Sequence, residues 1–148
     1  MVRTVRVSDT TPPQLGVLTI APLSPPDHMY RNFPMASLVS AASDSCDGTV
    51  GIGSVVITKV TSDEPDNGNG DGNTINDIVI APDCRSVQLR SERAGPLNGR
   101  VYHVTLRVTD ASGNSTTQVA TVTVPLDIST GVPAVDDGVM NTVVSACH

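Results

Sequence analysis

The chain has 148 residues, with 15 acidic residues against 9 basic ones and a formal net charge of −6. This acidity argues against a nucleic-acid partner, because proteins that bind nucleic acid present basic surfaces. No run of about 18 apolar residues occurs, so we expect no membrane-spanning helix. The stretch after Met1 also lacks the apolar segment of a signal peptide.

The composition favours strands over helices. The chain is rich in Val and Ile, contains 12 Gly and 11 Pro, and shows no sustained apolar pattern at helical spacing. The stretch 22–34 is rich in Pro and is predicted to be a connection. Nine segments have the composition or the alternation of β-strands, in chain order 2–7, 14–21, 35–43, 52–61, 76–81, 85–92, 100–109, 116–124 and 139–146.

Short strands at this spacing predict an all-β fold, an antiparallel sandwich of about seven strands, with a barrel as the alternative. We assign residues 14–125 to the sandwich. Residues 1–13 are predicted to be an N-terminal linker strand, and residues 126–148 a C-terminal tail with its own extension strand.

Antiparallel strand order also predicts which connections meet. If each strand reverses direction, the connections alternate between two ends of the sandwich. One end then collects 22–34, 62–76 and 92–100. The other end collects 44–48, 81–84 and 110–114.

These connections carry a recognisable set of motifs, namely "SPPDH" (24–28), "SDSCD" (43–47), "TSDEPDNGNGDGNTINDI" (61–78), "LRSERAGPLNGRVYHVTLRVTDASGN" (89–114) and "TVTVPLD" (121–127). The set resembles the immunoglobulin-like repeats of bacterial secreted and cell-surface proteins, similar in style to hyalin-repeat and PKD-type modules. The chain departs from that pattern at Met29, where a Lys is usual, and at Leu126, where a His is usual. The resemblance implies an immunoglobulin-like sandwich in an extracellular setting, used as a spacer or adhesive module without catalytic activity.

The most acidic stretch, "DEPDNGNGDGNTIND" (63–77), has the residue types of a calcium loop. Calcium takes six to eight oxygen ligands from carboxylates, amides and carbonyls, and Gly lets a short loop wrap the ion. The spacing Asn67-x-Asn69-x-Asp71-Gly72 matches the opening of an EF-hand loop, but Ile78 replaces its closing acid. We therefore predict a looser calcium site, with ligands drawn from Glu64, Asp66, Asn67, Asn69, Asp71, Asn73 and Asp77.

Two other interpretations of this stretch remain open. An acidic loop can be held by ion pairs to Arg90, Arg93 or Arg100, which the strand order brings to the same end, or it can be a mobile solvated loop. A second acidic group, Asp44 with Asp47 and Asp110, is predicted at the opposite end. There we favour ordinary turn hydrogen bonds over a metal.

The three cysteines allow one disulfide. Their shared end and the extracellular setting favour Cys46 with Cys84, which would close a loop of roughly 38 residues and contribute about 3–4 kcal/mol. Cys147 is then a free thiol or forms an intermolecular bond. Pairing of Cys147 with one of the other two is the alternative.

Catalytic chemistry has little support in the sequence. His28, His103 and His148 lack the spacing of zinc ligands, and no G-x-S-x-G motif is present. We predict that the chain is not an enzyme and assign no catalytic residues.

The first predicted strand favours self-assembly. In tandem repeats such a segment belongs to the end of the preceding domain, so here we expect an orphan strand centred on Thr4, Val5, Arg6 and Val7. It can add to the open sheet edge of a second copy, fold back on its own sandwich, or belong to a longer chain of which this is a fragment. The strand 139–146 is a second candidate donor.

Together these patterns predict an extracellular, calcium-stabilised structural module that self-associates end to end as a stalk or fibre subunit. The alternative is an adhesin or carbohydrate-binding accessory module. A flat aromatic platform for sugars is disfavoured because Tyr30, Phe33 and Tyr102 are the only aromatic residues.

Overall fold

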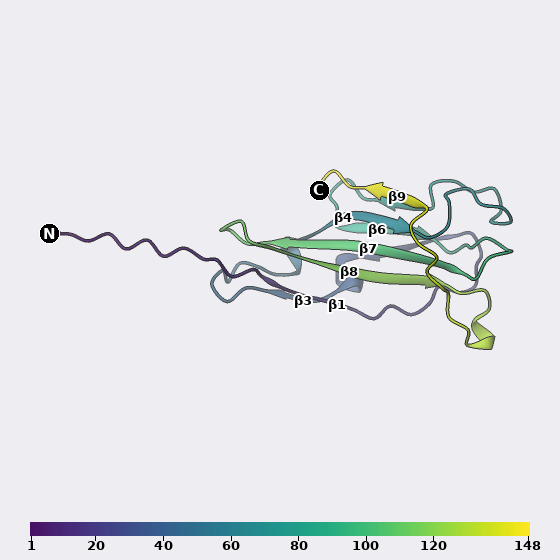
Figure 1. Cartoon of the computed structure of the whole chain (residues 1–148), viewed down its shortest axis with the longest axis horizontal. Helices are drawn as coiled ribbons and strands as arrows, with labels where there is room; N and C mark the ends of the chain where they lie inside the picture. Colours follow the sequence, from purple (N-terminus) through teal and green to yellow (C-terminus); the bar gives the residue numbers. More distant parts are fainter.

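The computed structural model describes residues 1–148 and confirms an all-β antiparallel sandwich (Figure 1). Its only helical segments are single turns: α1 (Met35–Leu38), η1 (Ile52–Ser54) and η2 (Ile128–Thr130). No helix is both long and apolar enough to cross a membrane. The strands are β1 (Gln14–Val17), β2 (Tyr30–Pro34), β3 (Val39–Ser43), β4 (Val55–Ser62), β5 (Ile78–Ile80), β6 (Ser86–Arg90), β7 (Arg100–Thr109), β8 (Ser115–Val124) and β9 (Asn141–Val144).

The strands form one four-stranded sheet, β8-β7-β4-β9, which packs against β2-β6-β5 and the pair β1-β3. β2, the single turn α1 and β3 follow one another without a break, so the chain passes directly from the β2-β6-β5 sheet into the β1-β3 pair. The long hairpin β7–β8 pairs Arg100 with Val124 at one end and Thr109 with Ser115 at the other. This hairpin sets the length of the sandwich.

The core lies between the sheets and follows the alternation of the strands. On β7 the side chains of Tyr102, Val104, Leu106 and Val108 are fully buried, whereas His103 and Thr105 between them are half-buried. Burying each such aliphatic side chain contributes about 1.5–3 kcal/mol. A cluster of 19 buried residues forms in this way, drawn from eight strands, α1 and Leu23 of the connection between β1 and β2.

Most predicted strands are confirmed, and five predictions need correction. The segment 14–21 is a strand only to Val17, 35–43 begins with the turn α1 before β3, and 52–61 begins with the turn η1 before β4. β2 was missed because its prolines indicated a connection, yet Phe33 within it is buried in the core and its residues pair with β6.

The fifth correction concerns the N-terminus, because residues 2–7 form no strand on their own sandwich. Residues 1–8 instead run away from the body of the molecule, whereas Pro13 is buried (Figure 1). The contacts that hold residues 1–13 come late in this segment: Asn114 Nδ2 donates to the Asp9 carbonyl (3.2 Å) and Thr116 Oγ1 donates to the Pro13 carbonyl (2.5 Å).

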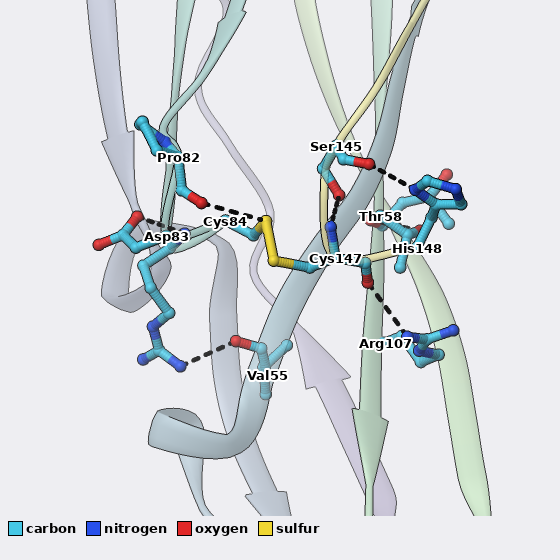
Figure 2. Close-up of a disulfide and its surroundings, with 11 residues drawn as sticks. Val55, Thr58, Pro82, Asp83, Cys84, Arg107, Ser145, Cys147 and His148 are labelled. Carbon is cyan, nitrogen blue, oxygen red and sulfur yellow. Dashed lines mark hydrogen bonds between the residues drawn. A yellow bond between two sulfur atoms is a disulfide. The ribbon is translucent and has the colours of Figure 1, made fainter.

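The C-terminal strand is confirmed as β9, and it completes the sheet of its own chain by pairing with β4. This pairing returns the chain end to the β5–β6 turn, where Cys147 forms a disulfide with Cys84 (Figure 2). The predicted Cys46–Cys84 pair is therefore wrong, and Cys46 is free and exposed. The disulfide links residues 63 positions apart, which corresponds to about 4 kcal/mol in the chain-entropy model.

A buried carboxylate–arginine cluster as the candidate functional site

Four acidic and two basic side chains meet at one end of the sandwich, and we call them the acidic cluster. Glu64 follows β4, Asp71 and Asp77 precede β5, Glu92 follows β6, and the bases come from the end of β6 and the start of β7. The strand-order prediction that 62–76 and 92–100 share an end is thus confirmed. The members are Glu64, Asp71, Asp77, Glu92, Arg90 and Arg100.

Arg100 is the centre of the cluster. It occupies the first position of β7 on the same inward face as Tyr102, so the alternation of the strand buries its guanidinium completely. Its Nε donates to Glu64 Oε2 (3.0 Å) and its Nη1 donates to Asp77 Oδ2 and to the Tyr102 hydroxyl (3.1 Å). A buried arginine is tolerated only when such partners satisfy its charge.

Arg90 lies on the solvent side of the cluster, with its side chain slightly exposed. Its Nε lies 3.2 Å from Asp77 Oδ1 and 3.6 Å from Glu92 Oε2. Its other nitrogens donate to the carbonyls of His28 (2.9 Å) and Ile75 (3.0 Å), so one side chain joins three connections. The guanidinium also stacks over the Tyr30 ring, 4.2 Å from its centroid.

Three of the carboxylates converge. One ligand atom from each of Asp71, Asp77 and Glu92 lies within 4.8 Å of the other two, and all three residues are buried. Asp71 accepts backbone hydrogen bonds from Gly68 and Asn73, and Glu92 Oε2 accepts from Thr74 Oγ1. Carboxylates packed this closely need a proton or a cation between them.

The cluster carries more negative than positive charge. Four carboxylates face two guanidinium groups, which leaves two negative charges, apart from the half-exposed His28 imidazole, whose Nδ1 lies 3.3 Å from Glu92 Oε2. Two buried oxygens, Glu64 Oε1 and Glu92 Oε1, also lack a hydrogen-bond partner. Unpaired buried anions are costly, so this imbalance calls for an explanation.

The acidity of the carboxyls reflects the same imbalance. Burial, reinforced by the neighbouring Glu92 carboxylate, raises the pKa of Asp77 to about 7, against the opposing effect of Arg100. Burial also raises the pKa of Glu64, although Ala94 N–H and Arg100 bind its carboxylate. The cluster therefore disfavours the ionised form of both groups despite its arginines.

The structure distributes the predicted calcium ligands unequally. Asp71 and Asp77 meet in the cluster, and Glu64 lies beside them on Arg100. Asp66 instead accepts the backbone N–H groups of Asn76 and Asp77, each at 2.9 Å. The side chains of Asn67, Asn69 and Asn73 belong to exposed residues.

Of the arginines proposed to hold the loop, Arg90 and Arg100 pair with its acids. Arg93 does not, since its Nη2 donates to the Leu126 carbonyl (3.0 Å). Glu92 is the member of the cluster that the sequence did not predict as a ligand. It lies 15 positions after Asp77 on another connection, and only the shared end of the sandwich pointed to it.

The opposite end is also rich in Asp, but its carboxylates bind backbone. Asp44 Oδ1 accepts the N–H groups of Cys46 and Asp47, both at 2.8 Å, and Asp47 Oδ2 accepts from Ala111 (2.9 Å). Asp110 Oδ1 accepts from the Asn114 N–H (2.8 Å). These are the turn hydrogen bonds that the sequence favoured. The hydrogen bond from the Thr49 hydroxyl, followed by those from the Ala111 and Thr49 N–H groups, lowers the pKa of Asp47.

Comparisons of the chain with protein-family models, with curated proteins and with solved structures find no match. Any function must therefore be inferred from the arrangement of the side chains. It places a charged, buried cluster at one end of the sandwich, while residues 1–8, which pair with no strand, project from the other end.

Proposed function

We propose that the chain is a secreted, immunoglobulin-like structural module that self-associates end to end, with residues 2–7 acting as the donor segment. The observation that carries this proposal is the exposure of that segment. Val2, Val5 and Val7 are 95%, 81% and 93% exposed, and none packs on its own sandwich. Apolar side chains placed in this way on an extended segment are suited to binding a second copy.

Charge supports a receiving surface at the far end of the molecule. Residues 1–8 contain Arg3 and Arg6 and no acid, whereas residues 126–138 contain Asp127, Asp136 and Asp137 and no Lys or Arg. The donor segment leaves one end of the long axis, and the segment around η2 lies near the other (Figure 1). Opposite charges at opposite ends favour head-to-tail contact.

A shallow hollow next to this acidic segment offers a seat for an aliphatic side chain. Its volume of about 170 Å³ is comparable to an apolar cavity that admits benzene. Ile128 and Val132 contribute exposed apolar surface to it. It is lined by Pro22, Thr123, Pro125, Ile128, Gly131, Val132 and Pro133.

A contact between different surfaces of two copies is heterologous, so it propagates into a filament unless it closes into a ring. β9 is not the donor in this proposal, because it is already paired with β4. The Cys84–Cys147 disulfide supports an oxidising, extracellular location.

The carbohydrate-binding alternative finds less support. Phe33 and Tyr102 are buried, and the Arg90 guanidinium covers one face of Tyr30. The aromatic rings are thus engaged within the sandwich. We therefore favour the structural role.

Assembly tests this proposal by sedimentation velocity over a wide range of protein concentration. We expect the full chain to form larger species as concentration rises. Deletion of residues 1–8, or the double change Val5→Asp with Val7→Asp, should leave a monomer because the donor is lost. Val119→Asp, on an exposed Val of β8, is the matched control and should assemble like the parent chain.

Mixing two variants distinguishes the donor segment from the acceptor hollow. Ile128→Asp should block the acceptor hollow and keep the donor segment, whereas the 1–8 deletion does the reverse. Each variant alone should be monomeric, and their mixture should give one-to-one dimers. A full chain that stays monomeric, or a deletion variant that still assembles, would refute the proposal.

A further inference from the structure

We infer that Asp71, Asp77 and Glu92 bind one calcium ion inside the acidic cluster. Calcium–oxygen distances are 2.3–2.6 Å, so ligands on opposite sides of one ion lie up to about 5 Å apart. One oxygen from each of the three residues falls within 4.8 Å of the other two. A single ion can therefore contact all three carboxylates without a rearrangement of the backbone.

The carboxylate of Glu92 supplies an independent reason for an ion. Glu92 is fully buried, and its Oε1 has no hydrogen-bond partner. The nearest cation to that atom is Arg100 Nη1 at 3.7 Å, which is too long for a hydrogen bond. A cation between Glu92 and the two aspartates satisfies this oxygen.

The charge of the cluster selects a divalent cation. After Arg90 and Arg100 are counted, and apart from the half-exposed His28 imidazole at Glu92, two negative charges remain, and one doubly charged ion neutralises them. The ligands are all oxygens, which suits a hard cation rather than zinc. Three buried protein carboxylates favour calcium over magnesium, which retains much of its bound water.

This ligand set differs from the one that the acidic stretch alone predicts. Glu92 enters from the connection after β6, whereas Glu64 and Asp66 are committed to Arg100 and to backbone N–H groups. The ion thus bridges two connections of the sandwich. Its role is to lock the end cap, and it does not depend on residues 2–7 or on assembly.

Melting of the full chain and calorimetric titration with calcium test the inference. After treatment with EGTA and its removal, calcium at about a hundredfold above its Kd should raise the Tm by about 5–10 °C. Magnesium should give a much smaller shift. Asp83→Asn, which changes an exposed turn carboxylate, should behave like the parent chain.

Glu92→Gln distinguishes an ion site from a network of ion pairs. Gln can keep the oxygen that faces Thr74 and place its amide where Oε1 has no partner. It should therefore raise the Tm in EGTA, by removing an excess buried charge, and lose most of the calcium-dependent shift. Asp71→Asn should also lose the calcium shift, but without a gain in EGTA because Asp71 accepts two backbone N–H groups.

Three results would overturn the inference. Absence of both a calcium-dependent Tm and a binding heat in the parent chain would mean that a shared proton holds the carboxylates together. An equal shift with magnesium would exclude a calcium-selective site. A calcium shift that survives Glu92→Gln would remove Glu92 from the ligand set.

Discussion

The two ends of the sandwich use the same residue type for opposite purposes. At the acidic cluster, Asp71 and Asp77 are fully buried and meet other charged side chains. At the other end, Asp44 and Asp47 lie in turns and accept hydrogen bonds from nearby backbone N–H groups. The acidic cluster also has two arginines, whereas the turn end is tied by a disulfide from the β5–β6 turn.

Burial therefore decides what a carboxylate requires. Asp44 and Asp47 are only partly buried, and their turn hydrogen bonds add a modest gain. A buried Asp must find a cation or a proton, and the whole end then depends on that partner. We therefore expect substitutions at the acidic cluster to have larger effects than those among the turns.

The strongest test of this comparison is Arg100→Met. The change keeps an apolar stem but removes the central cation from Glu64 and Asp77. We expect a loss of about 5 kcal/mol in the free energy of unfolding, the upper end for removing one partner of a buried ion pair. Urea denaturation followed by circular dichroism measures it. Arg31→Met, at a half-exposed pair with Asp27, is the control and should cost less than 1 kcal/mol.

The sequence indicated the burial of Arg100 directly, but for Glu92 it indicated only the end of the sandwich. The predicted strand 100–109 coincides with β7, and Arg100 shares its parity with the inward-facing Tyr102. Alternation alone therefore indicates a buried arginine. Glu92 ends the predicted strand 85–92 and begins the connection 92–100, so the strand order placed it at the correct end of the sandwich. Its contact with Asp71 and Asp77 depends on how two connections pack against each other, which alternation does not indicate.

The prediction of the disulfide was wrong for a similar reason. Alternation predicted β9, but not that it would pair with β4. That pairing decides where Cys147 lies, and it brings the cysteine to Cys84 rather than leaving Cys46 as the nearest partner. Strand existence is thus local information, whereas sheet order is not.

Removing the disulfide tests the other end of the comparison. The double change Cys84→Ser with Cys147→Ser should lower the free energy of unfolding by about 4 kcal/mol, since it frees a long loop in the unfolded chain. Denaturant unfolding without reductant measures this. Cys46→Ser should have almost no effect, because that thiol is free and exposed. An equal loss in both variants would contradict the observed pairing.

The smallest expected effect is at the turns. Asp44→Ala removes the acceptor for the N–H groups of Cys46 and Asp47 and should cost about 1 kcal/mol. Asp44→Asn should cost less than Asp44→Ala, because the amide oxygen can still accept both bonds, while the amide nitrogen takes the place of Oδ2, which is buried without a hydrogen-bond partner. Both values should be the same in calcium and in EGTA. If the effect of Asp44→Ala grew in calcium, the group formed by Asp9, Asp44 and Cys46 would also hold an ion, and the contrast between the two ends would fail.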